Sequence, residues 1–130
     1  MGLILCPGDG DDDSPDASWS CTRFHSFRRR LAASEGFDLG GMWGFGGDRS
    51  WVDESTVLKP LLNHPDVGGD DLSPADCMAM LPRLEAITDE WTAAARADGD
   101  PLLRQHIEDA DLLAVVLRFC IDRDVPVIFV

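Results

Sequence analysis

Two prolines, each directly after a helix-capping residue, mark the starts of two long helices in the second half of the chain. Ser73 precedes Pro74, and Asp100 precedes Pro101. A side-chain oxygen at the cap position accepts a hydrogen bond from a free backbone amide, and proline suits the first helical position because its missing N–H needs no partner there. Asp76 stands where it can complete a reciprocal capping box with Ser73. The sequence therefore predicts one helix from each proline.

Apolar residues recur at helical spacing after both starts, to about Ala97 in the first helix and to about Asp122 in the second. The two stripes are Cys77, Leu81, Leu84, Thr88, Trp91 and Ala95, and Leu103, Ile107, Ala110, Ala114, Leu117 and Ile121. Pro82 predicts either a kink or the start of a separate helix. The last helix is nearly all apolar after Asp111, so we expect its second half to be the most buried element.

Two shorter helices and two strands complete the expected fold. Residues 20–34 and 55–63 have helical patterns, whereas residues 2–6 and 125–130 are apolar runs typical of buried strands. The two strands are expected to pair with each other, or to share a sheet with a third strand near 40–45. Pro126 should stand at a strand start or on an edge. The prediction is a helix-dominated α+β fold of about four helices, in a single domain over residues 1–130.

The charge is strongly negative, with 24 acidic against 11 basic residues and a net charge of −13. Proteins bind duplex nucleic acid and anionic membrane surfaces through cationic side chains, so neither is an expected partner. A basic protein partner is expected, and solubility is the alternative explanation of the charge. The acids assigned to partner binding lie in an exposed acidic loop over residues 8–18 and in a second loop: Asp11, Asp12, Asp13, Asp70 and Asp71. The run Arg28 to Arg30 is interpreted as a solvated face paired with acids.

Cysteine usage and the apolar runs bear on location. The chain has Cys6, Cys21, Cys77 and Cys120, without a C-x-x-C pair, and no secretory signal or membrane-length apolar stretch. We therefore expect a cytoplasmic protein with reduced, mostly buried thiols.

A glycine-rich segment, residues 40–47, carries two aromatic residues. It lacks the Lys-Ser/Thr pair of a phosphate-binding loop. We expect its glycines to form turns with positive φ that let Trp43, Phe45 and Trp51 fold onto the core. In the alternative, Trp43 and Phe45 form an exposed patch that contacts a partner.

Residues 63–76 have the outline of a degenerate EF-hand loop between two helices. The candidate cation ligands are His64, Asp66, Asp70 and Asp76. The set fits calcium poorly, because histidine is an unsuitable ligand, Gly68 supplies no carboxylate and one inserted residue breaks the spacing. No cofactor is the leading expectation, a weakly held divalent cation is the alternative, and a rigid loop whose aspartates cap turns explains the same residues.

Catalytic motifs are missing from the sequence, which contains no H-E-x-x-H, G-x-S-x-G or Walker pattern. His64 and Cys77 could form a catalytic pair, but Cys77 belongs to an apolar stripe, where a buried thiol is the commoner role. His106 and Asp109 are one helical turn apart, a spacing that is common by chance. Catalysis is therefore the less favoured interpretation.

Several segments between residues 18 and 92 resemble a family of small uncharacterised bacterial and phage proteins. They are Ser18-Trp19-Ser20, Phe27 to Ala32, Gly44 to Gly47, Leu58-Lys59-Pro60-Leu61-Leu62-Asn63-His64, Leu72-Ser73-Pro74-Ala75-Asp76-Cys77, Pro82-Arg83-Leu84 and Trp91. The family loop usually reads His-Ser-Asp-Cys-Asp-Gly, from which this chain departs at Pro65, Val67 and Gly68. The resemblance implies no activity, cofactor or partner.

Three functions follow from these patterns, in order of preference. The first is a small acidic binding or regulatory protein, of the inhibitor or immunity type, that engages a basic protein. The second is a divalent-cation module built on residues 63–76. The third is a small enzyme that uses His64 and Cys77.

Overall fold

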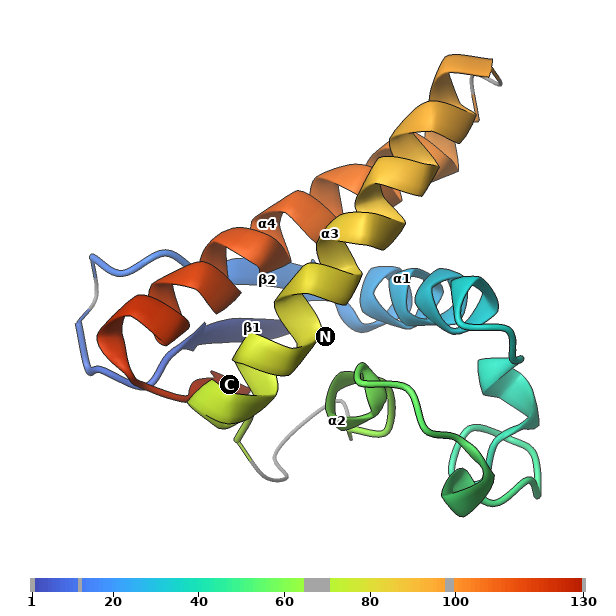
Figure 1. Cartoon of the computed structure of the whole chain (residues 1–130), viewed down its shortest axis with the longest axis horizontal. Helices are drawn as coiled ribbons and strands as arrows, with labels where there is room; N and C mark the ends of the chain where they lie inside the picture. The colour runs from blue at the N-terminus through green and yellow to red at the C-terminus, as the bar shows by residue number, and fades with distance from the viewer. Residues whose placement is uncertain (1, 12, 65–70, 98–99, 130) are drawn as a thin grey trace.

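The predicted α+β fold is confirmed by a computed structural model, which describes residues 2–11, 13–64, 71–97 and 100–129. Within these ranges the structure has four α-helices and three strands (Figure 1). In chain order they are β1 (Gly2–Pro7), β2 (Ala17–Ser20), α1 (Cys21–Ser34), α2 (Lys59–Leu62), α3 (Pro74–Ala97), α4 (Pro101–Arg123) and β3 (Val127–Phe129), with short 3-10 turns at η1 (Leu39–Gly41) and η2 (Trp51–Asp53).

The three strands form an antiparallel sheet in the order β2-β1-β3. The two predicted terminal strands pair as expected, with Leu5 opposite Phe129. The expected third strand near 40–45 is wrong, because β2 takes that place and sets Trp19 opposite Leu3. Ala17 to Ser20 alternate buried and exposed side chains, so the last two residues of the predicted loop 8–18 belong to the sheet. Pro126 directly precedes the edge strand β3, as predicted.

Both predicted helix starts are confirmed. Ser73 Oγ accepts a hydrogen bond from the Asp76 amide at 3.1 Å, and an Asp76 carboxylate oxygen accepts one from the Ser73 amide at 3.2 Å. Asp100 accepts one from the Leu102 amide at 3.0 Å. The helix α3 continues through Pro82, whose side chain is exposed, so the chain does not divide there into two helices.

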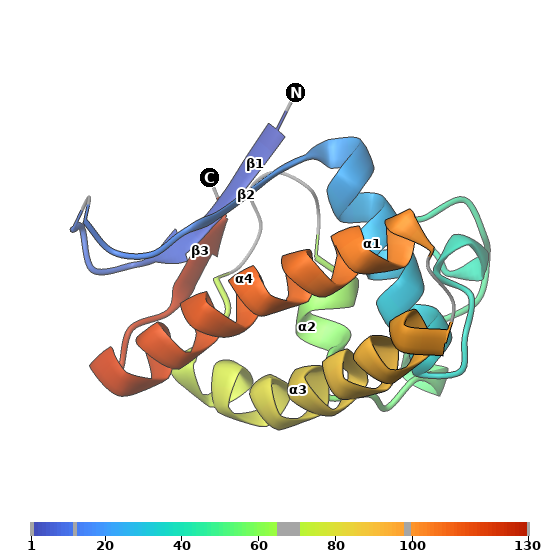
Figure 2. The ribbon, with the colours of Figure 1, turned by 90° about the horizontal axis from the view of Figure 1, so that it is seen from above.

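The core lies where α4 packs between the sheet and α3 (Figure 2). Leu84 of α3 and Leu117 of α4 are buried there, together with Phe24 and Phe27 of α1. The second half of α4 is not buried throughout, because one side of this helix, which includes Leu112 and Val115, faces solvent. Among the described helices, none combines the length and apolar character needed to cross a membrane.

The glycine-rich segment forms a tight loop, as predicted. Gly44 and Gly46 have φ of 92° and 103°, a region that side-chain-bearing residues rarely adopt. Trp51 is buried, and its indole N–H donates a hydrogen bond to the Trp43 carbonyl at 3.0 Å. The Trp43 side chain is 71% exposed, so the expectation that it folds onto the core is wrong.

Candidate functional site

The acids predicted to bind a partner lie on exposed segments wherever the structure describes them. Asp11 and Asp13 are exposed in the loop between β1 and β2, where the Asp11 carboxylate accepts a hydrogen bond from the Asp13 amide at 2.9 Å. Asp71 is exposed directly before Leu72. The predicted residues Asp12, Asp66 and Asp70 lie outside the described residues.

Three other predicted site residues, Trp43, Phe45 and His64, come together around one cleft of about 290 Å³. Arg28 also lines this cleft, although it is only 1% exposed. Its guanidinium lies 4.4 Å from the centre of the Phe24 ring and donates a hydrogen bond to the His64 carbonyl at 2.5 Å. The interpretation of Arg28 to Arg30 as a solvated face is therefore wrong for Arg28, which aromatic rings and a carbonyl hold in the interior.

The described part of the predicted cation loop adds no support for a metal site. The His64 ring is buried and stacks on Phe129, with 3.4 Å between ring centres. Asp76 already serves the capping box of α3. Over the described ranges, no three potential ligand side chains gather in one place. The hypothesis now depends on Asp66 and Asp70, which lie outside those ranges.

Cys77 is fully buried in the core, as predicted for a residue on an apolar stripe. Burial, together with the nearby Asp76 charge, raises the pKa of the Cys77 thiol to about 11. The thiolate is the reactive form of cysteine, so a thiol that stays protonated at neutral pH is a poor nucleophile. Cys120 is also buried, whereas Cys6 and Cys21 are partly exposed.

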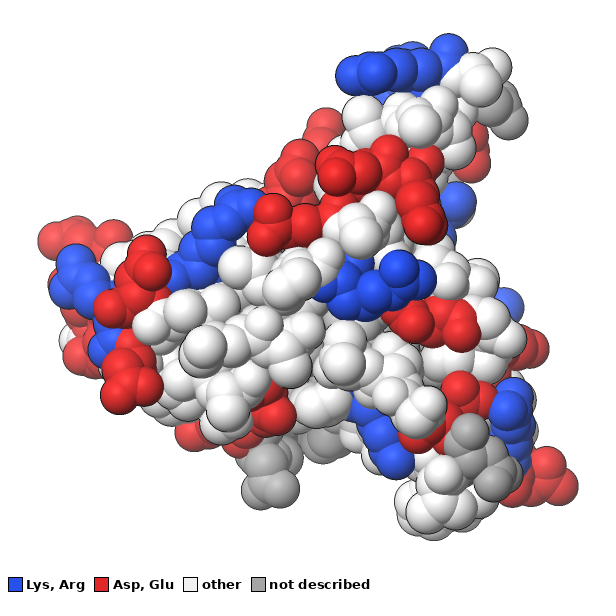
Figure 3. All heavy atoms as spheres, viewed as in Figure 1, with Lys and Arg blue, Asp and Glu red and all other residues white. Residues whose placement is uncertain are grey.

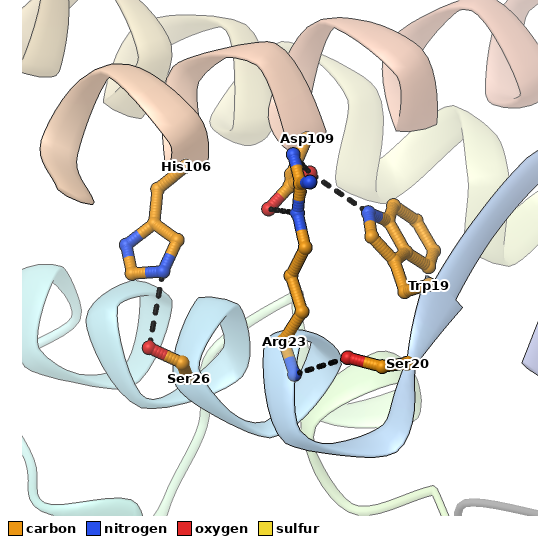
Figure 4. Close-up of polar contacts among 6 residues, drawn as sticks. All are labelled: Trp19, Ser20, Arg23, Ser26, His106 and Asp109. Atoms are coloured by element: carbon orange, nitrogen blue, oxygen red, sulfur yellow. Dashed lines mark hydrogen bonds and ion pairs between the residues drawn. The ribbon is translucent and has the colours of Figure 1, made fainter. Parts of the chain in front are cut away.

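A buried polar network between α1 and α4 was not anticipated from the sequence (Figure 4). Asp109 is fully buried among the apolar residues of α4. Its carboxylate accepts hydrogen bonds from the Trp19 indole at 2.9 Å and from Arg23 Nε at 2.9 Å, and it forms an ion pair with Arg23 Nη2 at 2.7 Å. This carboxylate thereby joins β2, α1 and α4. Its one signal in the sequence was the spacing of His106 and Asp109.

His106 lies one turn before Asp109 and is 1% exposed. Arg30 Nε donates a hydrogen bond to His106 Nδ1 at 2.7 Å. Nδ1 is therefore the acceptor nitrogen, and the neutral ring carries its hydrogen on Nε2, which donates to Ser26 Oγ at 3.1 Å. Burial first, and then the Arg30 charge, lower the pKa of His106. The structure thus holds this imidazole neutral in one tautomer.

The donor and acceptor directions of these hydrogen bonds are the reverse of those in a hydrolytic serine–histidine pair. In such a pair Nε2 must accept the serine proton while Nδ1–H donates to a carboxylate. Here Arg30 occupies Nδ1 as a donor, and Asp109 is engaged by Arg23 and Trp19. Ser26 consequently accepts a hydrogen bond from His106 and is not activated by it. The arrangement positions side chains and supplies no general base.

Two further hollows are lined in part by residues of α4. The α1–α4 cleft has a volume of about 640 Å³ and is lined by Ser26, Arg29, Arg30, Ala33, Gly36, Phe37, Asp38, Leu102 and His106. The α3–α4 groove has a volume of about 270 Å³ and is lined by Glu85, Thr88, Asp89, Asp111, Ala114, Val115 and Arg118. The α1–α4 cleft is lined by two arginines and one aspartate, and the α3–α4 groove by three carboxylates and one arginine, so the two hollows suit ligands of opposite charge.

Comparisons of the chain with protein-family models, with curated proteins and with solved structures give no match. The resemblance to small bacterial and phage proteins therefore stays a prediction. The functional argument depends on the charge and geometry described above.

Proposed function

We propose that the protein is a small binding or regulatory protein that docks a basic protein partner on its α3–α4 face. The observation that carries this proposal is the α3–α4 groove, which three carboxylates line together with the apolar residues Ala114 and Val115. An inhibitor or immunity-type protein for a basic target would use such a surface.

The carboxylates come from both helices. Glu85 and Asp89 are one turn apart on α3, and Asp111 faces them from α4. Glu85 forms an ion pair with Arg118 at 3.0 Å, but both side chains are about half exposed. An exposed pair contributes little to stability, so a partner's lysine or arginine can replace Arg118 at small cost.

Exposed aliphatic side chains lie beside the carboxylates on α4. Leu112 and Val115 are 45% and 47% exposed. With Glu108 and Asp111 they have the i, i+3, i+4, i+7 spacing of one helix face. An apolar centre within a polar rim is the usual composition of a protein interface, and here most of the charged rim residues are acidic.

The charge of the whole chain favours the same class of partner. Figure 3 shows acidic side chains gathered over α3 and α4, away from the turn that joins them, and again at the end of the molecule where the β1–β2 loop lies. With a net charge of −13, the protein attracts cationic proteins over about 10–30 Å in dilute salt. We propose that Asp11, Asp13 and Asp71 add to this field and that Trp43 offers a separate aromatic contact.

The test compares two double variants that remove the same amount of charge. Asp89→Asn with Asp111→Asn neutralises the groove, and Asp48→Asn with Asp122→Asn neutralises exposed acids elsewhere. Basic proteins that the wild type retains from lysate at low salt would be identified, purified and titrated against all three proteins. We expect the groove variant to weaken binding at least about tenfold, as for the loss of charge-assisted contacts, and the matched variant to change it much less.

Two results would overturn the proposal. The first is that no basic protein is retained at low salt. The second is that the groove variant binds the purified partner as tightly as the matched variant, which would assign the acidic charge to solubility alone.

A further inference from the structure

We propose that the α1–α4 cleft binds a small phosphate-bearing ligand. This site lies apart from the α3–α4 groove and does not depend on the basic partner. Its cationic residues, Arg29 and Arg30, come from α1, and Leu102 and His106 of α4 form the opposite side.

Arg29 is the side chain that first indicates an anionic ligand. It is exposed, lines the cleft, and has no ion pair or hydrogen bond within the described ranges. The chain has 24 acidic residues for 11 basic ones, so an arginine without a carboxylate partner is unexpected. A planar guanidinium matches the oxygens of a phosphate group with two parallel N–H donors.

Arg30 is a second cation, and its orientation is fixed. Its Nε is bound to His106 Nδ1 at 2.7 Å, and its Nη2 lies 3.7 Å from an Asp100 carboxylate oxygen. Its side chain remains 29% exposed. An arginine that is already positioned loses less side-chain entropy when a ligand binds.

Ser26 supplies a third donor through the buried histidine. Its Oγ accepts the hydrogen bond from His106 Nε2, so its own hydroxyl hydrogen remains to be donated. Ser26 lines the cleft together with both arginines. The neutral His106 thus orients Ser26 without adding or removing charge.

The acids of the cleft limit the size of the ligand. Asp38 lines the cleft, and its carboxylate accepts a hydrogen bond from the Gly40 amide at 3.0 Å. Asp100 stands near Arg30 on the α4 side. Together with the net charge of −13, these groups repel extended polyanions. A single phosphate group on the α1 side of the cleft, beside Arg29 and Arg30, is the ligand that fits.

The test is a titration with inorganic phosphate that follows the arginine Nε–H signals by NMR, against sodium chloride at matched ionic strength. We expect the Arg29 and Arg30 signals to move saturably and the Arg123 signal, from the opposite end of α4, to stay in place. Arg29→Gln should weaken phosphate binding about tenfold, because hydrogen bonds to charged groups are among the strongest. Arg123→Gln removes the same charge and should leave binding unchanged.

Ser26→Ala gives an independent check and should weaken phosphate binding severalfold while the folded spectrum is kept. Shifts that do not saturate, or that sodium chloride reproduces, would overturn the proposal. Equal effects of Arg29→Gln and Arg123→Gln would also overturn it, since they would show general charge screening and no site.

Discussion

Replacing Asp109 by Asn removes the charge at the centre of the α1–α4 network while keeping the shape of the side chain. The carboxylate is fully buried. It accepts hydrogen bonds from the Trp19 indole at 2.9 Å and from Arg23 Nε at 2.9 Å, and it forms an ion pair with Arg23 Nη2 at 2.7 Å. The amide keeps one oxygen that can accept from Trp19. Its NH2 group, however, presents donor hydrogens to a guanidinium that also has only donors.

The size of the effect follows from the exposure of the partner. Removing one member of a buried ion pair costs about 3–5 kcal/mol, because the remaining charge has no compensation. Arg23 is 34% exposed and can recover some water, so the cost here falls to about 2–3 kcal/mol. The free energy of unfolding of a domain of this size is roughly 5–15 kcal/mol. The variant should therefore still fold, with a clearly lower free energy of unfolding.

Urea denaturation followed by tryptophan fluorescence measures this difference. Asp111→Asn is the matched control, because it makes the same chemical change at an exposed position of the same helix. We expect the free energy of unfolding of the control to lie within about 0.5 kcal/mol of that of the wild type. Adding Arg23→Gln to Asp109→Asn should cost less than the sum of the single changes, because the two residues share one interaction.

A free energy for Asp109→Asn within about 0.5 kcal/mol of the wild type would refute this reasoning. It would mean that desolvation of the carboxylate had offset its hydrogen bonds almost completely.

Three further predictions concern pH, the core and the glycine-rich loop. Because the pKa of His106 is lowered in the folded state, the unfolded chain takes up a proton below about pH 6.5 that the folded protein does not bind. The free energy of unfolding should fall between pH 7 and pH 5, and urea midpoints for His106→Gln should fall less over that interval; parallel pH curves would contradict this. Leu117→Ala should cost about 2–5 kcal/mol, as for a buried leucine, and Gly46→Ala about 1–3 kcal/mol because its φ is positive. A neutral Leu117→Ala midpoint would contradict the placement of α4.

The helix starts and the terminal strands could be predicted because their signals are local. Ser73 with Asp76, and Asp100 with Pro101, determine the caps within a few residues. β2 was missed because four alternating residues next to an acidic loop are too short a pattern to separate from a turn. The exposure of Leu112 and Val115 was missed because an apolar run does not show which sides of a helix other elements cover.

The sequence by itself determined the α+β class, the two long capped helices and the acidic charge, because periodicity, capping and composition act over short distances along the chain. Only the tertiary structure decided the candidate sites. Trp19 and Asp109 meet across 90 positions, and Arg30 and His106 across 76. A polar residue such as Asp109 or His106 in an otherwise apolar helix is expected to be exposed unless a buried partner is known. Here the partners, Trp19 and Arg30, lie on other elements. The burial of Asp109 and His106, and the cleft that Arg29 and Arg30 line, therefore depend on the packing of α1 against α4.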